Sequence, residues 1–342
     1  MRVIDADGHC VEKDVELSEY ASYLGKPLAG AYGVGSMPLF PSLDGWFRVA
    51  GDKLAGGDVE HWRNFLDATG IELSFLYPTS GLAFGLIQDV EWAVSLAQAY
   101  NQWLYERYLR QDARLRGVAM IPVHDPVRAA QELRRAVQEL GFRAGLLPSA
   151  TLLHRGYGDP FFDPIYAEAE RLNVPLAVHG APSQGFGFDW STSFIVTHAL
   201  EHPIPLLIQC THMLLGGVFD RFPRLRVAYL ESGAGWLPFL IDRLEEEVER
   251  RAARWCPTLK ASPREVLQRG NLYVSCEVEE TTLPWVAQAI GEDQILFASD
   301  YPHERDREAF LGDIPAFVER SDLDERLKAK ILYDNACRFY AL

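Results

Sequence analysis

The sequence predicts a single (β/α)₈ barrel from three observations: short apolar segments recur, stretches of helical period separate them, and ionisable residues follow several of them. The apolar segments are rich in Val, Ile, Leu and aromatic residues. Near-continuous apolar runs without polar alternation are typical of parallel strands that are covered on both faces. The eight candidate strands are Val3–Ala6, Glu72–Tyr77, Gly117–Ile121, Ala144–Leu147, Val174–Val178, Val227–Leu230, Leu272–Ser275 and Ile295–Ala298.

Amphipathic stretches between these segments are long enough to form crossover helices. They include Glu91–Arg110, Pro126–Leu140, Pro164–Leu172, Trp236–Arg251 and Leu283–Ile290. A strand–helix alternation repeated eight times favours a closed barrel over an open doubly wound sheet. The last segment, Asp306–Leu342, is expected to form helices packed around the barrel. Because no low-complexity linker divides the chain, we expect one domain over residues 1–342.

Two connections are longer than ordinary loops. Residues 25–58, after the first strand, are rich in Gly, Pro and aromatic residues, and residues 181–194, after the fifth, contain Phe186, Phe188 and Trp190. Loops that follow the strands of a barrel lie at its C-terminal face, where barrel enzymes build their active sites. We therefore expect insertions at this face that act as lids or substrate walls. The alternative is that they are packed insertions without such a role.

Composition and charge narrow the classes of function. Hydrophobic residues make up 48% of the 342 residues and charged residues 24%, which is typical of a globular protein. The formal net charge of −15, without a basic stretch, argues against a nucleic-acid partner. No apolar run approaches the ~20 residues that span a bilayer. Five scattered cysteines fit a reduced, cytoplasmic protein, and a homodimer acting on a small-molecule substrate is the default expectation.

Ionisable residues stand where several predicted strands end. Asp7 and His9 follow the first strand at i and i+2, so their side chains point to the same side, while His179 follows the fifth, Glu231 the sixth and Asp300 the eighth. Each alone could be a structural turn or loop residue. Together they would converge on the catalytic face of the barrel. Imidazole and carboxylate ligands suit Zn²⁺, Mn²⁺ or Fe²⁺ better than Ca²⁺ or Mg²⁺.

The same residues belong to longer segments that match a known family in order and spacing. These segments are Ile4–His9 with Glu12, Ala177–Gly180, Gly216–Pro223 continuing to Gly233, Ser299–His303 and Asn335–Tyr340. The chain resembles the amidohydrolase superfamily, in the branch that contains aminocarboxymuconate-semialdehyde decarboxylase and resorcylate decarboxylase. The resemblance implies one divalent ion held by Asp7, His9, His179 and Asp300. Zn²⁺ is the first expectation, with Mn²⁺ or Fe²⁺ as alternatives.

Two departures from this family shape the expected reaction. Asp7 replaces the first histidine of the H-x-H pattern, and Glu231 stands where the better-known decarboxylases of the branch carry a catalytic histidine. A carboxylate would repel a substrate carboxylate, but it can accept a proton from metal-bound water. The sequence therefore favours a metal-dependent hydrolase in which activated water attacks an ester, lactone, thioester or amide of a bulky organic substrate.

In this interpretation Asp300 is a metal ligand and the proton shuttle, and Glu231 is an orienting residue or an alternate base. His303 contacts the substrate or supports Asp300, or is merely structural. The other histidines considered are expected to be structural, although His212 could reach the site: His124, His198, His202 and His212. Two alternatives remain, a nonoxidative decarboxylase of an aromatic or unsaturated carboxylic acid and a non-catalytic ligand-binding barrel. The second would leave costly unpaired charge among the four ligands.

Overall fold

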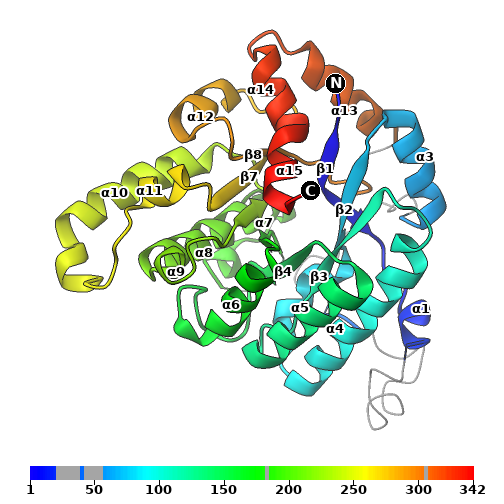
Figure 1. Ribbon diagram of the computed structural model, residues 1–342, viewed down its shortest axis with the longest axis horizontal. Coiled ribbons are helices and arrows are strands. Elements are labelled where there is room, and N and C mark those ends of the chain that lie inside the picture. Colours follow the sequence, from blue (N-terminus) through cyan, green and yellow to red (C-terminus); the bar gives the residue numbers. More distant parts are fainter. Residues whose placement is uncertain (21–38, 42–56, 182–184, 304–306) are drawn as a thin grey trace.

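The computed structural model describes residues 1–20, 39–41, 57–181, 185–303 and 307–342. Eight strands follow one another around a barrel in sequence order, and each is parallel to the next, which confirms the predicted (β/α)₈ fold (Figure 1). The strands are β1 Ile4–Cys10, β2 Leu73–Pro78, β3 Leu115–Met120, β4 Ala144–Pro148, β5 Leu176–His179, β6 Val227–Leu230, β7 Leu272–Cys276 and β8 Ile295–Phe297.

The barrel is nearly closed by backbone hydrogen bonds between β1 and the segment that follows β8. The N–H of Asp300 donates to the carbonyl of Asp7 at 2.9 Å, and the N–H of His9 donates to the carbonyl of Tyr301 at 2.8 Å. The backbone of three predicted site residues therefore forms the seam of the barrel. This seam fixes the spacing between the first and eighth strands at the C-terminal face.

Helices surround the strands and cover their outer face (Figure 1). Local signals explain their ends: in α5 the Asp125 carboxylate accepts from the N–H groups of Val127 and Arg128, and Gly141 ends the helix at φ +76°. The larger helices are α3 Val59–Thr69, α4 Val90–Leu104, α5 Pro126–Leu140, α6 Asp163–Leu172, α7 Phe194–Glu201, α8 Pro203–Leu215, α10 Trp236–Trp255, α12 Leu283–Ile290 and α13 Arg307–Glu319.

Shorter helical segments fill the connections. The short α-helices are α1 Asp14–Ser18, α9 Val218–Arg221, α11 Pro263–Gln268, α14 Glu325–Ala329 and α15 Asn335–Tyr340. The 3₁₀ turns are η1 Ser80–Leu86, η3 Pro160–Phe162 and η4 Phe188–Trp190, and the π turns are η2 Tyr105–Leu109 and η5 Lys330–Asp334. Because η2 continues α4, the two together span nearly the whole of the predicted helix Glu91–Arg110.

The interior of the barrel is packed rather than open. Side chains from the strands meet Phe339 and Tyr340 of the C-terminal α15, which join this inner cluster. The rings of Phe75 and Tyr340 stack with their centroids 3.3 Å apart. The Tyr340 hydroxyl donates to the carbonyl of Ala6 at 2.9 Å and lies 3.1 Å from the hydroxyl of Tyr77. The chain end thus supports the first two strands beneath the candidate site.

Some predicted boundaries and loops differ from the structure or lie beyond it. Strand β1 runs to Cys10, so Asp7 and His9 lie within the strand and not after it. The predicted loop 25–58 falls mostly outside the described residues. In the loop 181–194, η4 leads into α7, and the side chains of Phe186 and Trp190 are exposed. No helix in the described part of the chain is long and apolar enough to cross a membrane.

Candidate active site

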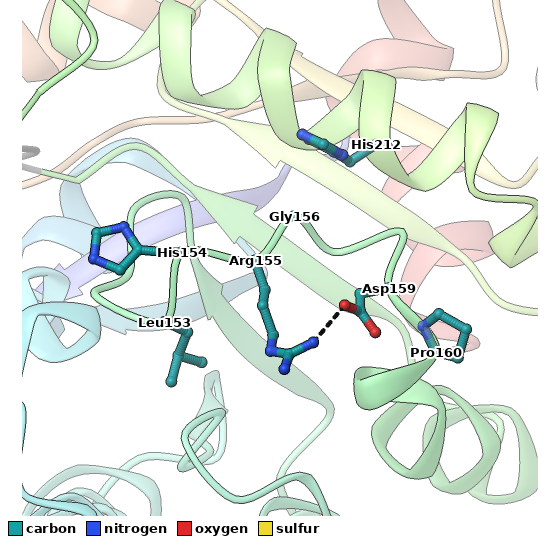
Figure 2. A pocket seen from close by; sticks show the side chains of 7 residues that line it. All are labelled: Leu153, His154, Arg155, Gly156, Asp159, Pro160 and His212. Atoms are coloured by element: carbon teal, nitrogen blue, oxygen red, sulfur yellow. Dashed lines mark hydrogen bonds and ion pairs between the residues drawn. The ribbon is translucent and has the colours of Figure 1, made fainter.

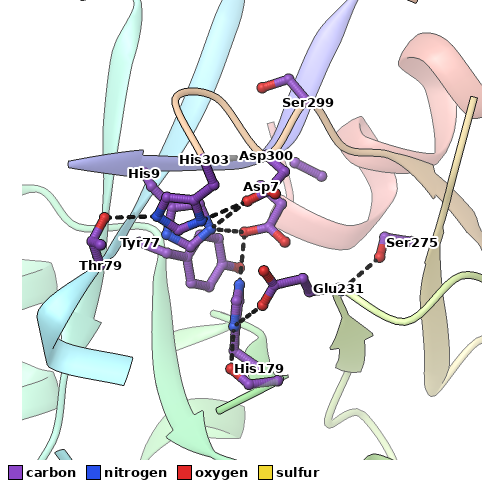
Figure 3. Close-up of polar contacts among 12 residues, drawn as sticks. Asp7, His9, Tyr77, Thr79, His179, Glu231, Ser275, Ser299, Asp300 and His303 are labelled. Carbon is purple, nitrogen blue, oxygen red and sulfur yellow. Dashed lines mark hydrogen bonds and ion pairs between the residues drawn. The ribbon is translucent and has the colours of Figure 1, made fainter. Parts of the chain in front are cut away.

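The C-terminal face brings the predicted metal ligands together (Figure 3). Nε2 of His179 lies 3.2 Å from Oδ1 of Asp7, and Nε2 of His9 lies 3.5 Å from the same oxygen. Nε2 of His9 also lies 3.4 Å from Oδ1 of Asp300. Four side chains from β1, β5 and the segment after β8 therefore direct donor atoms toward one small region.

The donor atoms fit a divalent ion. Nδ1 of His9 donates to the carbonyl of Pro78 and Nδ1 of His179 to that of Gly180, both at 2.8 Å, so each Nε2 faces the cluster. Asp7 Oδ2 and His9 Nε2 are buried and make no hydrogen bond to any described residue. Ligands at ~2.1 Å from an ion lie roughly 3 to 3.5 Å from one another, which is the spacing found here.

Burial and mutual charge control protonation in this cluster. Burial raises the pKa of Asp7 to about 7, against the opposing influence of His179. Burial alone would lower the pKa of His179, but the charges of Asp7 and Glu231 outweigh it and raise that pKa to about 10. Burial and the neighbouring His303 lower the pKa of His9. Without an ion, a proton is therefore held between His179 and Asp7, while His9 stays neutral.

Asp300 is the ligand-type residue that reaches toward solvent. Its side chain is 35% exposed, whereas those of Asp7 and His9 are almost fully buried. Nδ1 of His303 lies 2.9 Å from Oδ1 of Asp300, and Nε2 of His303 lies 2.8 Å from Oγ1 of Thr79. Burial raises the pKa of the Asp300 carboxyl, and His303 acts in the opposite direction. The arrangement gives a carboxyl at the open side of the cluster that an imidazole can protonate.

A second buried carboxylate, Asp5, supports this arrangement from below. Its Oδ2 accepts from the hydroxyls of Ser74 at 2.6 Å and Ser299 at 2.9 Å. Its Oδ1 accepts from the N–H groups of Ser299 at 2.9 Å and Asp7 at 3.2 Å. Asp5 thus connects β1, β2 and the segment after β8, and the position of Asp300 depends on it.

Glu231 lies beside the cluster, and a histidine that we expected to be structural lies next to it. Oε2 of Glu231 is 3.3 Å from Nδ1 of His179 and 3.0 Å from Nδ1 of His202, the residue that follows α7. Burial opposes ionisation of Glu231, but the charges of His202 and His179 outweigh it, so its pKa is lowered. In the sequence, the one feature that could have pointed to a site role for His202 is its position after the long loop. That position does not show which strand end the side chain faces.

His198 lies beside His202, with their ring centroids 5.4 Å apart, whereas His212 and His124 lie elsewhere. His212, on α8, lines a separate hollow of about 540 Å³ together with His154, Arg155 and Asp159 (Figure 2). An added Cβ at Gly156 would lie 2.2 Å from the His212 ring, so that ring packs against the β4–α6 connection. His124 is buried, and burial lowers its pKa to about 4. His212 therefore does not join the cluster of Asp7 and His9.

Comparison with known proteins agrees with this fold. A model of the family described as amidohydrolase matches residues 72–342. Aminocarboxymuconate-semialdehyde decarboxylase of Dictyostelium discoideum is 27% identical over 77% of this chain and 71% of its own length. Gamma-resorcylate decarboxylase of a Polaromonas species is 28% identical over 83% of this chain and 88% of its own. The chain belongs to the amidohydrolase family.

A solved structure extends the likeness in fold to the whole chain. The 5-carboxyvanillate decarboxylase of Novosphingobium aromaticivorans, in complex with manganese and 4-hydroxy-3-methoxy-5-nitrobenzoic acid, matches with a TM-score of 0.76. The sequences are 22% identical, and the match covers 100% of this chain and 96% of the other.

The comparisons correct one expectation drawn from the sequence and leave part of a second without support. Hydrolysis was the wrong choice, because the relatives are named decarboxylases, which favours the alternative carboxy-lyase reaction. The hydrolase prediction assumed that Glu231 carries an uncompensated charge, whereas two imidazoles flank it. The preference for Zn²⁺ is also not supported, since the ion named in the solved relatives is manganese.

Proposed function

We propose that the protein is a metal-dependent nonoxidative decarboxylase of an aromatic or unsaturated carboxylic acid. The observation that carries this proposal is the Asp300–His303 pair at the open side of the buried cluster. Decarboxylation of this kind needs one proton donor close to the carbon that loses its carboxylate. The decarboxylase relatives support the same reaction. The substrate is a small molecule, and the homodimer expected from the sequence stays a prediction.

Asp7, His9, His179 and Asp300 would hold the ion, and manganese is the first metal to test because solved relatives contain it. A divalent ion held there supplies positive charge that binds the carboxylate and any neighbouring hydroxyl oxygen of the substrate. The tautomers of His9 and His179 are already set by their backbone acceptors, Pro78 and Gly180. These histidines therefore need no rearrangement to act as ligands.

In the proposed reaction the Asp300 carboxyl donates its proton to the substrate carbon that bears the carboxylate. A C–H bond forms, the C–C bond to the carboxylate breaks, and its electron pair returns to the ring or double bond as CO₂ leaves. Asp300 is left as a carboxylate. His303, held by Thr79 at Nε2, then returns a proton from solvent through Nδ1 to Asp300.

The test is a product screen with manganese-loaded protein. Candidate substrates are hydroxybenzoic acids and unsaturated dicarboxylic acids, with aryl esters and lactones of similar size as controls. We expect CO₂ and the decarboxylated product from at least one acid and no hydrolysis of the controls. Activity should disappear after chelation and return with Mn²⁺. Ester or lactone hydrolysis without release of CO₂ from any acid would reject the proposal.

A further inference from the structure

His202 packs against the strand end that carries a metal-ligand residue. A Cβ added at Gly180, directly after His179, would lie 2.6 Å from Nδ1 and 3.0 Å from Cγ of the His202 ring. Any larger residue at position 180 would therefore displace this imidazole. The glycine makes room for the ring of His202, which follows α7, and this room lets the ring approach the Glu231 carboxylate.

Glu231 is held from several directions. Its N–H donates to the Ser275 hydroxyl at 3.0 Å, and its backbone adopts φ +64°, a region that residues other than glycine rarely occupy. Oε2 lies between the imidazoles of His202 at 3.0 Å and His179 at 3.3 Å. The side chain is 18% exposed, although Oε2 itself is buried. The strained backbone and the two imidazole contacts together hold the Glu231 carboxylate in one place.

The contact between His202 and Glu231 affects substrate binding, because an unpaired carboxylate in the site would repel a substrate that is itself a carboxylate. A lone buried Glu231 would repel such a substrate by an amount that reduces affinity roughly tenfold or more. Burial lowers the pKa of His202, but the charge of Glu231 outweighs burial and raises it to about 9. Nδ1 of His202 lies 3.0 Å from Oε2 of Glu231, and an imidazolium at that distance would leave the Glu231–His202 pair with little net charge.

We propose that His202 is a positioning residue that determines specificity: it fixes the Glu231 carboxylate and offsets its charge, so that the site accepts an anionic substrate. The inference rests on the proposed function, because it concerns the admission of a carboxylate. His202 acts through Glu231 and need not touch the substrate. Replacing His202 should therefore change the relative affinity for anionic and neutral ligands, and it should affect the stability of the fold less.

The test compares binding of benzoate and benzamide to manganese-loaded protein by ligand-observed NMR or calorimetry. The two probes match in size, differ in charge, and lack the hydroxyl groups that would favour turnover. We expect His202→Phe to weaken benzoate binding ~10-fold and to change benzamide binding less than ~2-fold. His212→Phe, on α8 and away from the cluster, is the matched control and should leave the benzoate-to-benzamide ratio unchanged.

A double-mutant cycle separates this role from simple packing. In a Glu231→Gln background, which removes the charge, His202→Phe should weaken benzoate binding less than ~2-fold. Equal losses in both backgrounds, or equal losses for both probes, would overturn the inference. If His202→Phe does not fold, His202→Gln serves instead, because it keeps an N–H donor without the charge; it should still weaken benzoate selectively, and an unchanged ratio would count against the inference.

Failure of this inference and failure of the proposed function are distinguishable. Benzoate selectivity that depends on His202, in a protein that decarboxylates no acid, would support the charge-balancing role and reject the decarboxylase. Decarboxylation by a protein whose His202→Phe variant binds both probes normally would support the decarboxylase and overturn the role of His202.

Discussion

His303 bridges the proposed proton donor and the end of β2: its Nδ1 lies 2.9 Å from Oδ1 of Asp300, and its Nε2 lies 2.8 Å from Oγ1 of Thr79. The imidazole therefore has one partner that orients it and one that it can protonate. Asp300 itself has φ +54°, so its side chain leaves the backbone in a direction that ordinary extended structure would not give. Both features define the open side of the site.

Asp300→Asn tests the proton donor. Asparagine keeps the size of the side chain and one oxygen that can coordinate a metal, but it has no acidic proton to give. We expect kcat to fall ~10²-fold or more while the ion stays bound. Kinetics and metal analysis of the same preparation provide the measurement. Unchanged turnover in metal-loaded Asp300→Asn protein would contradict the assignment.

His303→Gln and Thr79→Val should form a graded pair. Glutamine keeps hydrogen-bonding capacity but cannot relay a proton, so we expect kcat to fall roughly 10- to 100-fold. Valine at position 79 preserves shape and removes only the hydroxyl that orients the ring, so a smaller fall of ~3- to 10-fold is expected. Steady-state kinetics check both variants. A larger effect of Thr79→Val than of His303→Gln would show that His303 serves mainly as packing.

Metal binding should release protons. In the ion-free protein burial lowers the pKa of His179, but the charge of Asp7 outweighs burial and raises that pKa to about 10. The imidazole is therefore protonated at pH 7. An ion that takes Nε2 must displace that proton. Affinity should therefore rise with pH until the pH approaches about 10. Calorimetry in two buffers of different ionisation enthalpy measures the release, for which we expect about one proton per ion; no release would contradict it.

Glu168 should make stability depend on pH far from the active site. Its carboxylate accepts from Arg171 at 2.6 Å and Arg134 at 2.8 Å, and these bonds, despite burial, lower its pKa to about 2. Because folding lowers this pKa, ionised Glu168 stabilises the fold at pH values above its ordinary pKa near 4.3. This stabilisation is lost as the pH falls toward 2. Glu168→Gln should cost about 1 to 2 kcal/mol at pH 7. Urea unfolding should show that the difference in free energy of unfolding between the two proteins becomes smaller in acid. A difference that stays constant with pH would contradict the role of Glu168.

The parts of the fold that were predicted depend on local signals. The limits of α5 agree at both ends, because Asp125, Pro126 and Gly141 mark the start and stop of that helix within the sequence itself. The end of β1 was placed too early, because Asp7 and His9 are polar and look like loop residues. They belong to the strand because His9 pairs with Tyr77 and the backbone of both residues bonds to the segment after β8.

The candidate ligands could be predicted from sequence because each lies toward the C-terminal end of a strand or shortly after it, and parallel strand ends converge on one face. His202 could not, since its contact with Glu231 depends on how α7 packs over Gly180. The positive φ values of Glu231 and Asp300 also have no local signal. Without the contact to His202, the charge of Glu231 looked unbalanced, and that led to the wrong choice of hydrolysis over decarboxylation.

Deuterium incorporation is the most direct test of decarboxylation with Asp300 as proton donor. Manganese-loaded protein would convert an acid found in the screen in D₂O, and NMR and mass spectrometry would locate the label in the product. We expect CO₂ together with one deuterium at the carbon that carried the carboxylate, and loss of this reaction in Asp300→Asn. A product that retains its carboxylate, or one with no solvent hydrogen at that carbon, would contradict the proposed reaction.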